Sequence, residues 1–223
     1  MNDKTIKALL IIAIATALLV IGLQFAFIKL STNMMLEKLV PFMLKFEGGL
    51  SRDPSDTASR NPSPWTYKGK TGWHTNKGVT YSSFVGLAKK VGYIPNSKNF
   101  FEMPDTIWMG ILREGYMKPY PLDIIDHLPR VQAVIITWAW GSGVGGAKWR
   151  LARFQKEKMD VTRTSTYLDI VSNFDKQITV LNEREWFNKL CDQREKDFRK
   201  MKTFPVHGRG WLRRLAEFRT LFQ

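Results

Sequence analysis

The sequence contains little of what a metal centre or a disulfide needs. Among its 223 residues Cys191 is the only cysteine, which excludes an intramolecular disulfide and a zinc site built from cysteine ligands. The three histidines, His74, His127 and His207, lie far apart, and none has a partner at the spacing of a helical metal-binding pair. Unless ligands converge from distant positions, we expect no metal and no other cofactor.

Acidic residues are also scarce. Only 20 Asp and Glu residues stand against 34 Lys and Arg residues, and the net charge of +14 is spread along the chain instead of forming a terminal arm. Such a charge favours polyanions, among them nucleic acid, anionic lipid headgroups and the bacterial cell wall. Because the chain has neither a glycine-rich phosphate loop nor a zinc-finger spacing, we expect no nucleic-acid partner.

One long uncharged run stands near the N-terminus. Residues 8–28 are 21 consecutive uncharged positions, enough for a helix that crosses the roughly 30 Å hydrocarbon core of a bilayer. The small residues at 15–17, which would suit a cleavage site, fall in the middle of this run. We therefore expect residues 1–30 to be an uncleaved signal anchor. Lys4 and Lys7 favour an N-in orientation in the inner (cytoplasmic) membrane, with the rest of the chain in the periplasm. Permanent anchoring and release from the membrane both stay open.

The rest of the chain has a mainly helical pattern. Apolar residues between 33 and 46 recur at helical spacing, and Gly48 and Gly49 are expected to end this helix. Residues 50–80 are rich in Pro and Gly and predict loops with a small hairpin that turns at 68–70. Further helices are predicted over residues 82–91, 105–118, 130–140, 147–156, 175–202 and 211–222. The expected fold class is mainly α with a small β-hairpin region, preceded by one N-terminal transmembrane helix.

Carboxylates cluster around the predicted end of the first helix. Glu47 stands at that end, and Asp53 and Asp56 lie in the polar loop after it. Glycoside hydrolysis needs one carboxyl that keeps its proton near neutral pH and a second group that handles water or the cation-like transition state. Apolar neighbours such as Phe46 would bury Glu47 and raise its pKa, whereas Asp56 in a polar loop would stay ionised. The helix dipole disfavours an acid at this position, which favours a functional role for Glu47, but both Asp residues also suit turns.

Several short motifs resemble one protein family in their order and spacing. Residues 47–49 are Glu-Gly-Gly, residues 53–56 are Asp-Pro-Ser-Asp, and residues 75–80 are Thr-Asn-Lys-Gly-Val-Thr. An apolar helix with a Ser-Gly turn at 136–143, Phe-Gln at 154–155 and Gly-Trp-Leu-Arg-Arg-Leu at 210–215 follow. Together they resemble the glycoside hydrolase family 108 N-acetylmuramidases of phage endolysins and bacterial cell-wall enzymes, over most of residues 33–216.

This resemblance implies a lysozyme-like α+β fold and a specific reaction. The enzyme would hydrolyse the β-1,4 bond between N-acetylmuramic acid and N-acetylglucosamine in peptidoglycan, for host-cell lysis by a phage. Residues 31–128 would form the catalytic part and residues 129–223 a helical, peptidoglycan-binding part. Glu47 would be the general acid and Asp56 the general base. Thr75 would help to hold the attacking water, although it would also suit a capping position. We expect the protein to be a monomer.

Aromatic residues near the acids are the candidate substrate contacts. Trp65, Tyr67 and Trp73 lie in the loop beside the acids, and aromatic faces suit the apolar faces of sugars, although local packing would explain them too. Trp138 and Ser142 are further candidates, and core packing is the alternative role for Trp138.

The sequence departs from the family pattern in two places. Residues 57–74 insert a basic and aromatic loop before Thr75, and Thr137 and Gly141 stand where the family carries Asp and Asn. These departures leave a second hypothesis open, that of a catalytically inactive, membrane-anchored protein that only binds peptidoglycan.

Overall fold

One long helix joins two parts of a mainly helical chain. The structure, a computed structural model, describes residues 3–156 and 165–223. Its hairpin strands are β1 (Thr75–Asn76) and β2 (Val79–Thr80). The helices are α1 (Asp3–Phe46), α2 (Tyr81–Ala88), α3 (Ser97–Phe101), α4 (Asp105–Ile111), α5 (Pro129–Ser142), α6 (Val144–Lys156), α7 (Tyr167–Gln177), α8 (Glu183–Arg199) and α9 (Phe204–Phe222). The expected mainly α class is confirmed, and a small hairpin is present, but its strands turn at residues 77 and 78 and not at 68–70.

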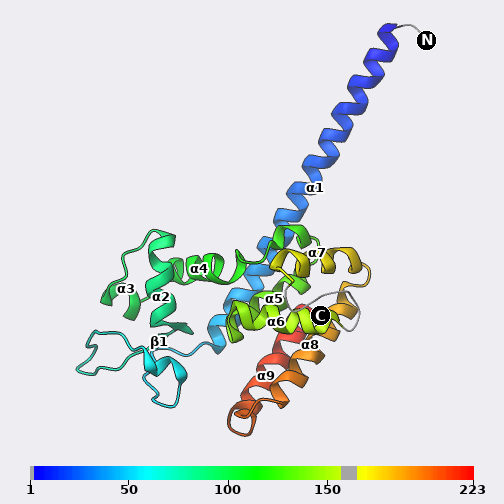
Figure 1. The fold of residues 1–223 in the computed structure, drawn as a ribbon. Coiled ribbons are helices and arrows are strands. Elements are labelled where there is room, and N and C mark those ends of the chain that lie inside the picture. The colour runs from blue at the N-terminus through cyan, green and yellow to red at the C-terminus, as the bar shows by residue number, and fades with distance from the viewer. Residues whose placement is uncertain (1–2, 157–164) are drawn as a thin grey trace.

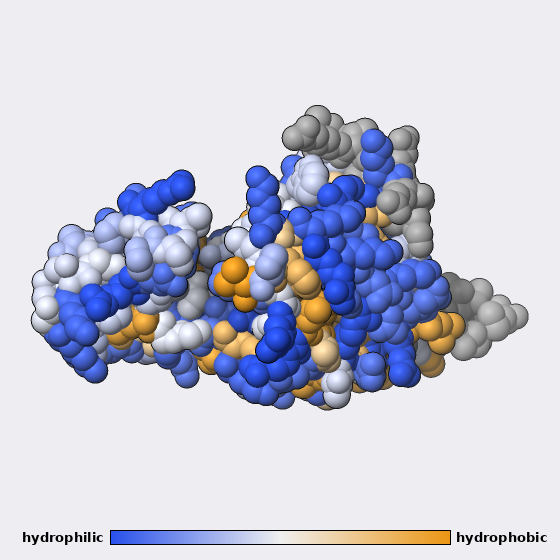
Figure 2. Space-filling model, turned by 90° about the horizontal axis from the view of Figure 1, so that it is seen from below, coloured by the Kyte–Doolittle hydropathy of each residue, from blue (hydrophilic) through white to orange (hydrophobic). Residues whose placement is uncertain are grey.

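The two parts lie on opposite sides of the C-terminal end of α1. Residues 50–111, which include the hairpin and α2 to α4, form a small lobe, and α5 to α9 form a larger helical body (Figure 1). Seen from below, the small lobe and the helical body are joined by a narrower waist (Figure 2). The end of α1 therefore delivers the residues that follow it to the boundary between the two parts.

The N-terminal part of α1 extends away from both the lobe and the body (Figure 1). Its described apolar side chains are more than half exposed: Ile11, Ile12, Ile14, Leu18, Leu19 and Leu23. Within the described residues, no helix meets the length and apolarity of a membrane-crossing one. The side chains of residues 8–10, 20, 21 and 24–28 lie outside the described set. The transmembrane helix over residues 8–28 therefore stays a prediction, as do the boundaries at 30 and 128.

The second half of α1 belongs to the hydrophobic core. Met35, Leu36, Leu39 and Met43 are buried at helical spacing, as the sequence pattern predicted. They belong to the same cluster of buried residues as α5, whose residues 131–139 are all buried. Burial of this stretch positions the C-terminal end of α5, where Trp140 and Ser142 lie.

The hairpin is fixed to the small lobe through its turn. Thr75 pairs with Thr80 and Asn76 with Val79, and the turn between them has positive φ at both Lys77 and Gly78. The Asn76 side-chain amide donates hydrogen bonds to the backbone oxygens of residues 100 and 101, at 2.6 and 3.2 Å. The predicted turn at 68–70 also forms, with reciprocal backbone hydrogen bonds between residues 67 and 70.

The helix predictions hold in part. The helices at 82–91, 105–118, 130–140 and 147–156 form, although residues 112–117 adopt the wider π-helical geometry. The prediction of one helix over 175–202 is wrong, because α7 ends at Gln177 and α8 begins at Glu183. The Asn182 side chain accepts a hydrogen bond from the backbone of Thr179, which stabilises the turn between these helices. The prediction also missed the start of α7 at Tyr167, which the capping box of Thr166 and Asp169 indicates.

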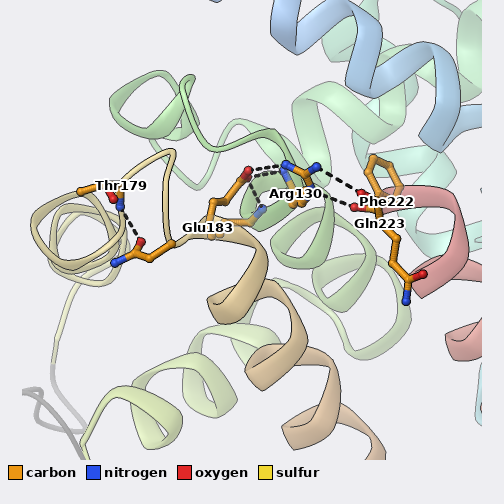
Figure 3. A network of polar contacts seen from close by, with 7 residues as sticks. Arg130, Thr179, Glu183, Phe222 and Gln223 are labelled. Atoms are coloured by element: carbon orange, nitrogen blue, oxygen red, sulfur yellow. Dashed lines mark hydrogen bonds and ion pairs between the residues drawn. The ribbon is translucent and has the colours of Figure 1, made fainter.

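Glu183 and Arg130 tie the helical body together. The Glu183 carboxylate accepts hydrogen bonds from the backbone N–H groups of Arg130 and Val131 in the first turn of α5, at 2.7 and 3.3 Å, and forms an ion pair with the Arg130 side chain. Arg130 in turn donates to the backbone oxygens of Phe222 and Gln223 (Figure 3). One buried carboxylate therefore caps α5 and orients the arginine that holds the end of α9.

Replacing this carboxylate should destabilise the whole body. We expect Glu183→Ala to lower the free energy of unfolding by roughly 2–4 kcal/mol, because two backbone donors and one guanidinium lose their acceptor. The matched control is Glu195→Ala, which removes a more exposed ion pair with Arg199 on the helix surface. This variant should change the free energy of unfolding by less than about 1 kcal/mol. Urea denaturation of both variants checks this, and equal losses would contradict it.

Candidate active site

Glu47 lies at the boundary between the small lobe and the helical body. It follows the last residue of α1, and its backbone N–H still donates to the Met43 carbonyl at 2.9 Å. The two glycines that follow turn the chain away. Its side chain is 14% exposed, so the carboxyl is largely withdrawn from water. The predicted helix end is confirmed within one residue.

Residues from distant parts of the chain surround this carboxyl. Arg214 of α9 donates from Nη1 to Glu47 Oε1 at 3.1 Å and from Nη2 to the Phe46 carbonyl at 2.7 Å. The Trp140 side chain at the end of α5 donates a further hydrogen bond to Glu47. The part of the chain predicted to be a separate peptidoglycan-binding region therefore supplies two direct partners of the proposed general acid.

Gly78 closes the opposite side of the carboxyl. A Cβ atom at this position would lie 2.2 Å from Glu47 Oε2 and 2.7 Å from its Cδ, far inside van der Waals contact. Gly78 also has a φ of +76°, which side chains rarely adopt. The glycine in the Thr-Asn-Lys-Gly-Val-Thr motif thus serves both the hairpin turn and the close approach of the hairpin to Glu47.

A pair of glycine substitutions separates these two roles. Gly69 has a similar φ of +72°, but a Cβ there would meet nothing within 4 Å. We expect Gly69→Ala to lower the free energy of unfolding by about 1–2 kcal/mol through backbone strain alone. Gly78→Ala should lower it further and displace Glu47, which would change the carboxyl carbon chemical shift of that residue in NMR spectra. Identical effects of the two variants would contradict the close contact.

The surroundings of Glu47 favour its protonated form. Burial raises the pKa of Glu47, although the charge of Arg214 and the hydrogen bonds from Trp140 and Arg214 act in the opposite direction. Tyr116 lies near enough to sense this charge, because Glu47 contributes to the raised pKa of Tyr116 after the larger effect of burial. The raised pKa of Glu47 means that its contribution to folding stability is present at low pH and is lost as pH rises through the folded-state value.

Removing Arg214 should raise the pKa of Glu47 further, because burial would then act with less opposition. We expect Arg214→Gln to show this in an NMR titration of the Glu47 carboxyl carbon. Arg213→Gln is the matched control, since Arg213 is the neighbouring arginine on α9 and its guanidinium pairs with Glu217 instead. A pKa of Glu47 that is unchanged or lower in Arg214→Gln would contradict the electrostatic role.

Two neighbouring cavities lie near Glu47, one that includes Glu47 in its lining and one within the helical body. The first, the acid cavity, has a volume of only about 20 Å³, and its lining includes Glu47, Thr137, Trp140, Arg194, Trp211 and Arg214. The second, the arginine cavity, has a volume of about 120 Å³, and its lining includes Trp138, Ser142, Arg150, Arg194, Asp197 and Trp211. They share a wall made by Arg194, Phe198, Trp211 and Arg214.

The other two predicted catalytic residues lie in the small lobe. Asp56 is exposed at the start of a short 3₁₀ helix (Thr57–Arg60), and its Oδ1 accepts a hydrogen bond from the Ala58 backbone at 2.9 Å. Thr75 lies in β1 of the hairpin that contacts Glu47, and its Oγ1 is 2.9 Å from His74 Nδ1. Among the described residues, the hydrogen bonds to the Glu47 carboxyl come from Arg214 and Trp140. The roles of Asp56 and Thr75 stay predictions.

The loop aromatics pack on one another. Tyr67 stacks on Phe101 with a centroid separation of 4.4 Å, and Trp65 and Trp73 meet the same ring edge-on at 6.3 and 6.5 Å. All three are partly buried against the core. The structure brings Trp65, Tyr67 and Trp73 together, and their role as sugar contacts stays a prediction.

The remaining predicted contacts line the arginine cavity. Trp138 is almost fully buried there, and the Ser142 hydroxyl donates to the Trp138 carbonyl at 2.7 Å. Thr137, one of the departures from the family pattern, accepts a hydrogen bond from Arg194 on its hydroxyl and another on its carbonyl. In the described part of the chain, no three His, Cys, Asp or Glu side chains gather closely enough to hold a metal ion.

Sequence reasoning missed Arg214, Gly78 and Arg194. Two of them stood inside the quoted motifs, but nothing local indicates that Arg214, which is 167 positions away, reaches Glu47. A signal for Arg194 did exist, because it continues the buried spacing of Phe187, Leu190 and Cys191 along α8. A charged residue within such an apolar stripe is a functional candidate.

Comparison with known proteins shows the fold and no more. The chain matches no protein-family model and no curated protein sequence. It is similar to the solved structure of Brucella abortus SagA, with a TM-score of 0.55 and 20% sequence identity over 84% of this chain and 93% of that chain. The two share an architecture. Membership of the family 108 muramidases is not established and stays a prediction.

Proposed function

We propose that the protein is a peptidoglycan muramidase in which Glu47 is the general acid. The observation that carries this proposal is the burial of Glu47, with a raised pKa, between Gly78, Trp140 and Arg214 at the boundary of two lobes. Cleavage of a glycosidic bond requires a carboxyl that still holds its proton near neutral pH. The motifs around Glu47 add support, since their order resembles the family 108 enzymes.

Arg214 has a defined part in this reaction. When the Glu47 proton passes to the leaving glycosidic oxygen, the carboxyl becomes an anion in a largely buried place. The two donors beside it, Arg214 and Trp140, then stabilise the charge without moving. Asp56 acts as the general base that activates water, and Thr75 helps to hold that water. If the water lies between Glu47 and Asp56, the mechanism is inverting, for which carboxyl groups roughly 6.5–9.5 Å apart are expected.

The partner and the location follow from charge and from α1. The net charge of +14 would hold the protein on the anionic cell wall, and this attraction should weaken as salt is added. The exposed apolar residues of α1 support a tether in the inner membrane, with the rest of the chain in the periplasm. A phage endolysin tethered until host lysis combines these properties.

The test is the release of reducing ends from purified peptidoglycan by the full-length protein. We expect Glu47→Gln to lower the rate by about 10²–10⁴-fold, because it removes general acid catalysis. Glu102→Gln, which changes an exposed acid at the end of α3, should leave the rate unchanged. Retained activity in Glu47→Gln would overturn the assignment. No release by the parent, with cell-wall binding intact, would favour the inactive binding protein.

A further inference from the structure

Arg194 is a buried cation with incomplete hydrogen bonding. It is 8% exposed on α8, in the wall shared by the two cavities. Its Nη1 donates to the Thr137 hydroxyl at 2.8 Å and its Nη2 to the Thr137 carbonyl at 3.0 Å. The Nε atom is buried and has no hydrogen-bond partner among the described residues. A buried guanidinium donor without an acceptor is costly, so Arg194 would gain from an added acceptor.

The nearby carboxylates are already engaged by other arginines. Glu47 is paired with Arg214 at 3.1 Å. Asp197 is paired with Arg153 at 2.5 Å and faces Arg150 Nε at 3.5 Å. Among the described residues, Arg194 therefore has no carboxylate counter-ion.

Burial does not discharge this arginine at neutral pH. Burial lowers the pKa of Arg194 to about 10, with Arg214 and Arg150 acting in the same direction and Cys191 against it. The side chain keeps its proton at pH 7, so the positive charge beside the cavity remains. An uncompensated charge in such a place favours the entry of an anion.

The arginine cavity has the size and lining for such an anion. Its volume is about 120 Å³, and three arginines line it, Arg150, Arg194 and Arg214. Asp197 contributes one negative charge to the same lining, on the side of Arg150. Planar guanidinium forks match the two oxygens of a carboxylate, and the Trp138 and Trp211 rings supply apolar surface beside them.

We propose that the arginine cavity binds a carboxylate group of a ligand, with Arg194 as its principal donor and Arg150 as a second. One source is the lactyl or peptide carboxylate of a muramic-acid glycan, and this assignment rests on the proposed function. It would place an acidic substituent next to the acid cavity that contains Glu47, so the site would select muramic acid over its neutral neighbour. The other source is a free small carboxylate.

The experiment measures equilibrium binding to the full-length protein by calorimetry. The probes are N-acetylmuramic acid, its methyl ester, which lacks the charge, and acetate. We expect the acid to bind about tenfold or more tightly than the ester, as for a charge-assisted hydrogen bond. Comparable binding of acetate would identify a site for free carboxylates, and binding that needs the sugar would identify a glycan subsite. An ester that binds as tightly as the acid would overturn the proposal.

Three variants locate the site. Arg194→Gln should lose about tenfold in affinity for the acid, and Arg150→Gln, which changes a more exposed side chain, about threefold. Arg153→Gln is the matched control, because Arg153 pairs with the same Asp197 but does not line the cavity. Arg194→Gln is used only if circular dichroism shows that it folds. If it does not fold, the affinities of Arg150→Gln and Arg153→Gln for the acid are compared with each other. Equal affinities in those two variants would overturn the proposal.

Glycan release, measured in parallel, keeps the two proposals apart. If the unsubstituted protein releases no reducing ends but binds the acid more tightly than the ester, the carboxylate site is supported and the muramidase activity is not. If the unsubstituted protein releases reducing ends but binds the acid and the ester equally, the muramidase activity is supported and the carboxylate site is not. Repeating the binding measurements in Glu47→Gln excludes any contribution from turnover.

Discussion

The pairing of Glu47 with Arg214 links the end of α1 to the middle of α9 across 167 positions of sequence. A carboxyl this deeply withdrawn from water must be either protonated or matched by a cation, and the site contains the means for both. Gly78 lies close to one side of the carboxyl, and Trp140 and Arg214 donate hydrogen bonds to it. The position of Glu47 therefore depends on α9 packing correctly, and the small lobe and the helical body are fitted around the same few atoms.

The sequence predicted the local features of this site and failed on its long-range ones. The helix end before Gly48 and the tight turn after residue 67 follow from backbone preferences that neighbouring residues determine. The hairpin was placed wrongly, because the prediction put its turn at 68–70 and the paired strands turn at residues 77 and 78. The contact of Arg214 with Glu47 depends on how α9 packs, which no local pattern records. The break between α7 and α8 was missed because its charged and polar residues fit a helical pattern as well as a turn, and the Thr179–Asn182 hydrogen bond decided between them.

The face of α8 toward the cavities mixes two kinds of chemistry. Phe187, Leu190 and Cys191 pack into the core, and Arg194 and Asp197 follow at the same helical spacing. Polar groups at core positions lower stability unless each finds a partner, and only part of the hydrogen-bonding capacity of Arg194 is met by Thr137. A helix built for stability alone would carry apolar residues at these two positions, so this end of α8 gives up packing for a charged wall.

Arg130 holds the end of α9 through the backbone at residues 222 and 223, and α9 also carries Arg214, the partner of Glu47. Arg214 leaves the ribosome 167 residues after Glu47, which corresponds to on the order of 10–30 s of synthesis. During that interval Glu47 and its apolar neighbours on α1, Phe42, Met43 and Phe46, exist without their cation. A nascent chain that lacks α9 cannot hold the carboxyl in place, so a shortened translation product would carry the acid motif but not a completed site.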